Sequence, residues 1–374
     1  MKRFLAVMLV MASLWAAGCG SSEPDSATGV TVDPVLINGQ LPVFSAPKTL
    51  KVLTHDSFAV SQAVLDEFEE ATTIKVELIP AGDAVAMTNA AILTAGNPVA
   101  DVIFGFDENL LAKVISNRLL VEFRPERLAT VEPTYVADTS GVATPIDHGD
   151  VCVNFDRVSF TRSGIALPVT FEDMASEKIK NEFVVQNPTT STPGLAFMLA
   201  TIAHFGGGDD PSENAAWLQY WSRLKNNGVK VADGWESAYY GDFSGGSGKG
   251  DRSLVVSYAS SPPAEVIDPS VAVDESPTGV IAATCYRQIE FAGILRGSPN
   301  LQAAAAFIEF MLGPSFQSDV PEQMYVYPVV KGTPLPEIFA KYTAPVSAPL
   351  TISYSEVATN RDRWITQWSK LFRS

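Results

Sequence analysis

The sequence predicts an α/β protein built as two lobes. Strand-like and helix-like segments alternate between residues 49 and 104, and a second alternating stretch begins at Val151. A later strand, Tyr286–Phe291, then returns the chain to the first lobe. A strand–helix–strand order favours parallel sheets covered by helices. Two passages between lobes favour a hinged cleft that closes on a ligand.

The first lobe begins with three strand-like segments separated by two helices. The periodic spacing of Val60, Val64 and Phe68 predicts a helix over residues 59–71. A second helix is expected over residues 87–95. The strands are expected over residues 49–55, 74–79 and 100–104. Ligands of such sheets bind at the carboxyl ends of the strands. This favours the loops 54–58, 81–83 and 105–109 as binding loops.

The second lobe contains a hydroxyl-rich turn, residues 187–194, between a short strand and a helix. Thr192 is the expected N-cap of that helix and Pro193 its first residue. Free backbone N–H groups at a helix start suit a polar or anionic group of a ligand. An ordinary capped helix remains the alternative on the local pattern alone.

The lobes are expected to divide the chain unevenly. Residues 49–147 and 288–330 form the expected lobe 1, and residues 148–287 the expected lobe 2. Residues 331–374 are predicted to be a C-terminal helical segment that packs on the lobes, with its last helix over residues 361–372.

The N-terminus has the pattern of a lipoprotein signal peptide. A short basic start and an apolar run are followed by small residues directly before Cys19. We expect residues 1–18 to be removed and Cys19 to be lipidated, which anchors an extracytoplasmic protein to the membrane. Residues 19–48 are rich in Ser, Gly, Pro and Asp, and predict a flexible tether.

Two further cysteines, Cys152 and Cys285, lie in strand-like segments. An oxidising compartment permits a disulfide between them if the strands are neighbours. Two buried thiols are nearly as compatible with the sequence.

Composition narrows the classes of function. The chain has 374 residues, 46% hydrophobic and 18% charged, which fits a globular protein. Its net charge of −16 argues against nucleic acid as a partner. The three histidines, His55, His148 and His204, form no catalytic or metal-binding motif, so neither an enzyme nor a metal site is predicted.

Six short motifs follow one another from about residue 49 to the C-terminus. They are Thr54-His-Asp-Ser-Phe58, Ala100-Asp-Val-Ile-Phe-Gly105, Ser191-Thr-Pro-Gly194, Gly234-Trp-Glu-Ser-Ala-Tyr239, Ser257-Tyr-Ala-Ser-Ser-Pro262 and Ala306-Phe-Ile-Glu-Phe-Met311. In this order they resemble the thiamine-binding proteins of bacterial ABC importers. The resemblance implies a type II periplasmic-binding-protein fold, a membrane permease and a cytoplasmic ATPase as partners, a monomer, and thiamine or thiamine phosphate as ligand without a cofactor.

The resemblance also implies a set of ligand-binding residues. Trp235 and Tyr258 suit stacking on the permanently charged thiazolium ring. Asp83 would supply negative charge and a hydrogen-bond acceptor. The full expected set is His55, Asp83, Ala84, Ser191, Thr192, Trp235, Tyr258, Ala259, Ser260, Ser261, Pro262 and Tyr325.

Two departures leave the ligand open. His55 and His148 stand where the resembling family has aromatic residues, and acidic Asp147 and Asp150 lie nearby. A related cation or a pyrimidine precursor of thiamine is therefore an alternative ligand. A ferric-ion receptor of the same fold is another, because Tyr239, Tyr240 and His55 could form an iron site.

Overall fold

The computed structural model describes residues 30–138, 140–266 and 274–373. Residues 31–374 form one compact unit. The expected signal peptide, residues 1–18, and Cys19 lie outside the described residues.

Lobe 1 contains a parallel sheet in the order β2-β1-β3. The predicted strand–helix alternation is confirmed, although α2 begins three residues before the predicted start because Asp83 caps it. Its elements are β1 (Thr49–Thr54), α1 (Gln62–Thr72), β2 (Lys75–Pro80), α2 (Ala84–Leu93), β3 (Val102–Asp107), α3 (Glu108–Ser116), η1 (Glu126–Thr130), η2 (Pro133–Tyr135), α8 (Leu301–Met311), α9 (Pro314–Gln323) and β9 (Tyr327–Pro328).

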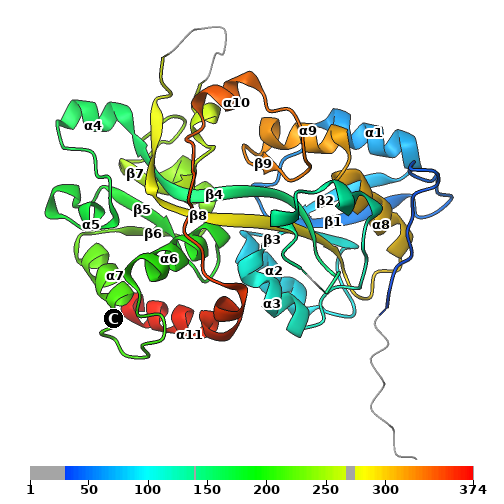
Figure 1. Ribbon diagram of the computed structural model, residues 1–374, viewed down its shortest axis with the longest axis horizontal. Helices are drawn as coiled ribbons and strands as arrows, with labels where there is room; N and C mark the ends of the chain where they lie inside the picture. The colour runs from blue at the N-terminus through cyan, green and yellow to red at the C-terminus, as the bar shows by residue number, and fades with distance from the viewer. Residues whose placement is uncertain (1–29, 139, 267–273, 374) are drawn as a thin grey trace, which may run out of the picture. The chain divides into compact units, whose positions relative to one another are not determined.

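Lobe 2 contains a second parallel group, in which β5 lies between β6 and β7. The buried helix α6 packs against this group, and α7 packs on α6 (Figure 1). Its elements are α4 (Arg157–Ser163), α5 (Phe171–Met174), η3 (Glu177–Ile179), β5 (Phe183–Gln186), α6 (Thr192–Phe205), α7 (Ala216–Asn226), β6 (Lys230–Ala232), the π-helical turn η4 (Ser237–Asp242), β7 (Leu254–Tyr258) and η5 (Pro262–Glu265).

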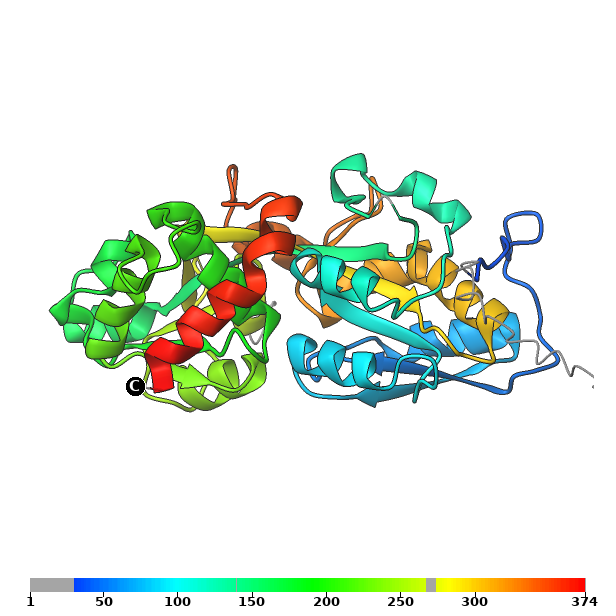
Figure 2. The same ribbon diagram turned by 90° about the horizontal axis from the view of Figure 1, so that it is seen from below.

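Two long antiparallel strands, β4 (Thr144–Asp156) and β8 (Thr278–Ile294), run through both lobes. They join the two parallel groups into one sheet of order β2-β1-β3-β8-β4-β7-β5-β6, with β9 paired to β4. The expected lobe boundaries fall in the middle of these strands, where His148 pairs with Ile289. Figure 2 shows both strands crossing between the lobes.

The C-terminal segment also contacts both lobes. Helix α10 (Glu337–Tyr342) contacts η5, and α11 (Tyr354–Arg373) contacts α3 of lobe 1 and α7 of lobe 2. Trp364 of α11 is buried and donates a 2.6 Å hydrogen bond from Nε1 to the carbonyl of Gly208. Helix α11 begins seven residues before the predicted start at residue 361.

Residues 31–47 differ from the predicted flexible tether. Val32 and Val35 are buried in the hydrophobic core of lobe 1. The backbone N–H of Val32 donates to the carbonyl of Glu122, and that of Phe44 to the carbonyl of Thr72. The prediction rested on the Ser, Gly, Pro and Asp residues of the whole range 19–48, whereas the part from residue 31 onward also contains Val, Leu, Ile and Phe, and two of these valines anchor it.

Cys152 of β4 and Cys285 of β8 are joined by a disulfide. The sequence left a disulfide and two buried thiols as alternatives, and the structure contains the disulfide. In the described part of the chain, no helix combines the length and apolar character that crossing a membrane requires.

Candidate functional site

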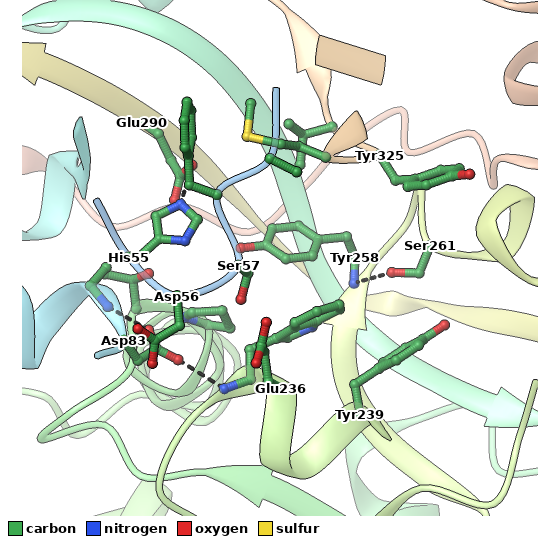
Figure 3. A pocket seen from close by; sticks show the side chains of 18 of the residues that line it. His55, Asp56, Ser57, Asp83, Glu236, Tyr239, Tyr258, Ser261, Glu290 and Tyr325 are labelled. Atoms are coloured by element: carbon green, nitrogen blue, oxygen red, sulfur yellow. Dashed lines mark hydrogen bonds and ion pairs between the residues drawn. The ribbon is translucent and has the colours of Figure 1, made fainter. Parts of the chain in front are cut away.

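A cavity of about 280 Å³ lies between the lobes and is lined by residues of both. Lobe 1 contributes the loop after β1, the start of α2 and the segment after α9. Lobe 2 contributes the start of α6, the η4 region and the end of β7, and β8 contributes Glu290 (Figure 3). Of the three loops expected at the carboxyl ends of the strands, 54–58 and 81–83 contribute residues to the lining, and 105–109 contributes none.

His55 follows β1 and lies against β3. A side chain at Gly105 would bring its Cβ within 2.1 Å of His55 Cδ2, so the close fit of the ring requires glycine there. His55 Nε2 is buried without a hydrogen-bond partner and lies 3.6 Å from Glu290 Oε2. Burial by itself would lower the pKa of His55, but the charge of Glu290 and weaker contributions from Asp83 and Asp56 raise it above its ordinary value.

Glu290 belongs to a row of three carboxyl residues across adjacent strands. The strand register places it opposite Asp107 of β3 on one side and Asp147 of β4 on the other. Like charges directly opposite each other in a sheet repel. Burial raises the pKa of Asp147 well above its ordinary value, and neighbouring Glu290 raises it further. The neutral form of Asp147 is therefore favoured beside the Glu290 carboxylate.

Asp83 links the two lobes. It caps α2, with Oδ1 accepting a 2.7 Å hydrogen bond from the backbone N–H of Ala84. Its Oδ2 accepts a 2.8 Å bond from the backbone N–H of Trp235 in lobe 2. Next to this pair, the N–H of Ala86 donates to the carbonyl of Thr190 at 3.0 Å. Burial raises the pKa of Asp83, and the hydrogen bond from Trp235 opposes the shift.

The aromatic part of the lining is held by hydrogen bonds behind it. Trp235 stacks on Tyr239 with 4.8 Å between ring centroids and donates from Nε1 to Ser257 Oγ at 3.0 Å. The Tyr239 hydroxyl donates to Glu265 Oε1 at 2.7 Å. Since these partners lie outside the cavity lining, the indole ring is positioned before a ligand arrives.

The lining is strongly acidic. Asp56, Asp83, Glu236 and Glu290 line the cavity, and His55 is the one basic residue among its described lining residues. No lysine or arginine belongs to this lining set. Such a cavity has a negative potential and favours a cation. Aromatic rings at its wall favour a flat cationic group.

The structure brings most of the expected ligand-binding residues together. Eight of them line the cavity: His55, Asp83, Ala84, Thr192, Trp235, Tyr258, Ser261 and Tyr325. The remaining four do not belong to the lining: Ser191, Ala259, Ser260 and Pro262.

Those four residues have other structural positions. Ser191, not Thr192 as predicted, is the N-cap of α6, and its hydroxyl accepts from the backbone N–H of Gly194 at 3.4 Å. The proline is therefore the second helical residue. Ala259 packs against the disulfide, Pro262 starts η5, and Ser260 is buried with an unpaired hydroxyl.

His148 does not belong to the cavity lining. Its ring stacks between Tyr135, at 4.0 Å between centroids, and Tyr327, at 5.2 Å. Burial lowers the pKa of His148 to about 3, with a further contribution from Arg287. Arg287 Nε in turn donates to Asp150 Oδ1 at 2.6 Å. The neutral His148 ring therefore packs at the crossing strands.

Sequence reasoning missed three acidic lining residues, Asp56, Glu236 and Glu290. The first two lie inside the quoted motifs next to predicted residues. Glu290 had a usable signal, because Tyr286, Gln288 and Glu290 place polar groups at every second position of a crossing strand.

The two tyrosines of the alternative iron site, Tyr239 and Tyr240, do not have the arrangement that binding of ferric iron requires. Tyr239 is buried and its hydroxyl is bound to Glu265. Burial and the Glu265 charge raise the pKa of Tyr239 well above its ordinary value, which opposes the tyrosinate that binds ferric iron. Tyr240 packs edge-on against Trp235, and burial raises its pKa also. The described residues contain no group of three or more His, Cys, Asp or Glu side chains that could hold a metal ion.

Comparisons with known proteins give a family match, similar sequences and similar folds. A family model described as bacterial extracellular solute-binding protein matches residues 63–346. The thiamine-binding periplasmic protein of Escherichia coli K12 is 30% identical over 90% of this chain and 97% of its own length. A solved structure titled periplasmic thiamin binding protein superposes with a TM-score of 0.71 at 28% identity, covering 86% of this chain and 96% of that one. The apo ferric ion-binding protein A of Pasteurella haemolytica has a TM-score of 0.64 at 17% identity over 87% and 98%, a likeness of fold.

Proposed function

Because the chain belongs to the family of bacterial extracellular solute-binding proteins, whose members bind solutes and are not catalysts, we propose that its solute is thiamine. The observation that carries the proposal is the lining of the cavity, which combines four carboxylates with Trp235 and Tyr258 and contains no lysine or arginine among its described residues. Thiamine carries a flat thiazolium ring whose positive charge is permanent at physiological pH. Relatives named as thiamine-binding support the same assignment.

Ligand contacts follow from the positions of the lining groups. Trp235 and Tyr258 would stack on the rings, each contributing about 0.5–2 kcal/mol. Thr192 and Pro193 bring the first turn of α6 to the cavity, where its backbone dipole suits the hydroxyl of thiamine. A phosphate at this place would face the repulsion of the surrounding carboxylates. We therefore expect unphosphorylated thiamine to bind more tightly than thiamine phosphate.

Closure of the lobes would convert binding into a signal. The hydrogen bonds Trp235–Asp83 and Ala86–Thr190 join the lobes and can form only while these segments are close. A ligand that contacts both lobes shifts the protein toward this closed state by its differential affinity. The closed form would then deliver thiamine to a membrane permease driven by a cytoplasmic ATPase, with the receptor acting as a monomer.

Isothermal titration of residues 31–374, refolded to remove carried-over ligand, with thiamine tests the assignment. We expect one-to-one binding with an affinity in the micromolar range or tighter, and weaker binding of thiamine phosphate. Absence of heat and of any thermal shift with thiamine and its phosphates would overturn the ligand assignment while leaving the family unchanged. Ferric salt is the comparison ligand, and a visible tyrosinate–iron band would favour the iron alternative.

The lipid anchor is a separate part of the proposal. The basic start, the apolar run and the small residues before Cys19 support cleavage and lipidation at this cysteine. Fractionation of cells expressing the full chain tests it. The wild-type protein should remain with the membranes, and Cys19→Ala should release it or leave it uncleaved. A wild-type protein found wholly in the soluble fraction would contradict the anchor.

A further inference from the structure

The four cavity carboxylates differ in the partners they already have. Both oxygens of Asp83 accept backbone hydrogen bonds, and Asp56 Oδ1 accepts from the backbone N–H of Gly82 at 2.9 Å. Glu236 is largely exposed to solvent, which screens its charge. Glu290 is 8% exposed, and its ion-pair partner in the described structure is His55. It is therefore the buried carboxylate best placed to change partners.

His55 also lines the cavity and is the ion-pair partner of the Glu290 carboxylate. The close contact with Gly105 and the neighbouring Phe104 ring, 5.8 Å away between centroids, restrict the imidazole. Its buried Nε2 has no hydrogen-bond partner and faces Glu290 at 3.6 Å (Figure 3). A buried ring nitrogen left without a partner is costly unless a charge interaction compensates for it. A proton on Nε2 provides that interaction.

The charges around His55 come from every neighbouring element. Asp56 lies on its own loop, Asp83 at the start of α2, Glu236 before η4 and Glu290 on β8. Behind Glu290 lie Asp107 at the end of β3, Glu108 at the start of α3 and Asp147 on β4, and burial raises the pKa of all three carboxyl groups. The groups that face His55 directly are all acidic. The surroundings favour one positive charge in the cavity, and the imidazolium ion supplies it in the ligand-free protein.

We propose that Glu290 is the counter-ion of the bound cation, and that His55 releases its proton to solvent when the cation takes over this carboxylate. The inference rests on the proposed cationic ligand. It adds that the site gives up the proton of His55 in exchange for the positive charge of the ligand. A second cation beside the imidazolium would repel it, and His55 can lose its charge whereas a thiazolium cannot. Proton and cation therefore compete for Glu290.

Two consequences distinguish this arrangement from a fixed counter-ion. Affinity for a permanent cation should rise with pH, by up to about tenfold per pH unit, while His55 is protonated in the free protein. A neutral ligand that keeps the pyrimidine ring, the thiazole-derived ring and the hydroxyethyl chain should show no such rise. Thiochrome, the uncharged tricyclic oxidation product of thiamine, is a suitable neutral probe.

The first experiment follows the histidine proton signals of residues 31–374 by NMR, and needs no ligand. The chain has three histidines, so His55→Gln assigns its resonance directly. We expect His55 to titrate above its ordinary value of 6.5 and to titrate lower in Glu290→Gln. The proposal would be overturned if the pKa of His55 were at or below its ordinary value, or if Glu290→Gln left that pKa unchanged.

The second experiment measures proton release on binding. Thiamine is titrated calorimetrically near pH 6.5 in buffers of different ionisation enthalpy, which reports protons released per ligand. We expect a fraction of a proton to be released, rising toward one as the pH is lowered, and none in His55→Gln. His204→Gln is the matched control, because His204 lies on α6 in an exposed pair with Glu172 at 3.3 Å. The His204→Gln variant should release as many protons per bound thiamine as the wild type.

The outcomes separate the two proposals. Thiamine that fails to bind at any pH overturns the ligand assignment, and the NMR titration still decides the His55–Glu290 pair. Thiamine that binds without proton release, or with equal release in His55→Gln, leaves the ligand assignment standing and overturns the competition. Binding that weakens on acidification in wild type and in His204→Gln, but not in His55→Gln, supports it.

Discussion

Asp83 Oδ2 accepts a 2.8 Å hydrogen bond from the backbone N–H of Trp235, although 152 positions separate the two residues in sequence. One lies at the start of α2 in lobe 1, and the other lies just before η4 in lobe 2. The same carboxylate also caps α2. Asp83 thus couples the start of a helix in lobe 1 to the backbone of lobe 2, in addition to any contact with a ligand.

Replacing Asp83 by alanine should weaken thiamine binding about 10- to 100-fold, because two buried N–H groups lose a charged acceptor. X-ray scattering should show a more expanded average form in saturating ligand. Asp83→Asn should have a smaller effect, since its amide oxygen can still accept one bond.

The matched control for Asp83 is Asp66→Ala on the exposed face of α1. It changes the net charge equally and should bind thiamine as the wild type does. Wild-type affinity and compaction in Asp83→Ala would mean that the link between the lobes contributes nothing to closure.

Trp235 should contribute through its ring and through its Nε1 hydrogen bond to Ser257. Trp235→Ala removes both and should lower affinity by about 10- to 100-fold, in line with one lost aromatic–cation contact in a desolvated site. Trp235→Phe keeps a ring over Tyr239 and should cost several-fold. Titration calorimetry measures both variants, and equal affinities for them would contradict a role for stacking.

The disulfide between Cys152 and Cys285 should stabilise the fold with little influence on the ligand. It joins the two crossing strands at a sequence separation of 133, and neither cysteine belongs to the cavity lining. The double replacement by alanine should lower the free energy of unfolding by about 2–5 kcal/mol.

Urea unfolding with and without a thiol reductant measures this effect. Reductant should lower the stability of the wild type toward that of the double variant and leave the variant unchanged. The expectation would be wrong if thiamine affinity in the native state fell by tenfold or more.

The sequence contained enough information for the lobes and for most of the cavity, because both follow from local signals. Strand–helix alternation set the order of β1, α1, β2, α2 and β3, and the motifs containing Asp83, Trp235 and Tyr258 marked the lining. Each of these signals lies within a short run of consecutive residues, so it can be recognised without knowing how distant segments pair.

Pairing between distant segments could not be predicted in the same way. The row Asp107–Glu290–Asp147 depends on the register of three strands. The β3–β8 pairing has one register shift and the β4–β8 pairing has two, and no local pattern specifies where such a shift falls. The packing of His148 between Tyr135 and Tyr327 depends likewise on β9 pairing with β4. The row of carboxyl groups across the three strands therefore became visible only in three dimensions.

The carboxyl row leads to a prediction about stability and pH. Burial raises the pKa of Asp107 from 3.8 to about 6, against the opposing hydrogen bond from Asn109 and with the Glu290 charge adding to it. The folded protein therefore holds this proton more tightly than the unfolded chain does. The resulting stabilisation is fully present below pH 3.8 and is lost as pH rises through about 6.

Asp107→Asn should remove this component, because an asparagine can still cap α3 through the N–H groups of Asn109 and Leu110 but carries no proton to lose. Between about pH 4 and pH 7, the wild type should lose about 1–3 kcal/mol of stability relative to the variant. Urea unfolding at a series of pH values measures the difference, with the exposed Asp66→Asn as control. Parallel stability curves for wild type and Asp107→Asn would show that the Asp107 carboxyl titrates alike in the folded and unfolded chains, contrary to its place beside Glu290.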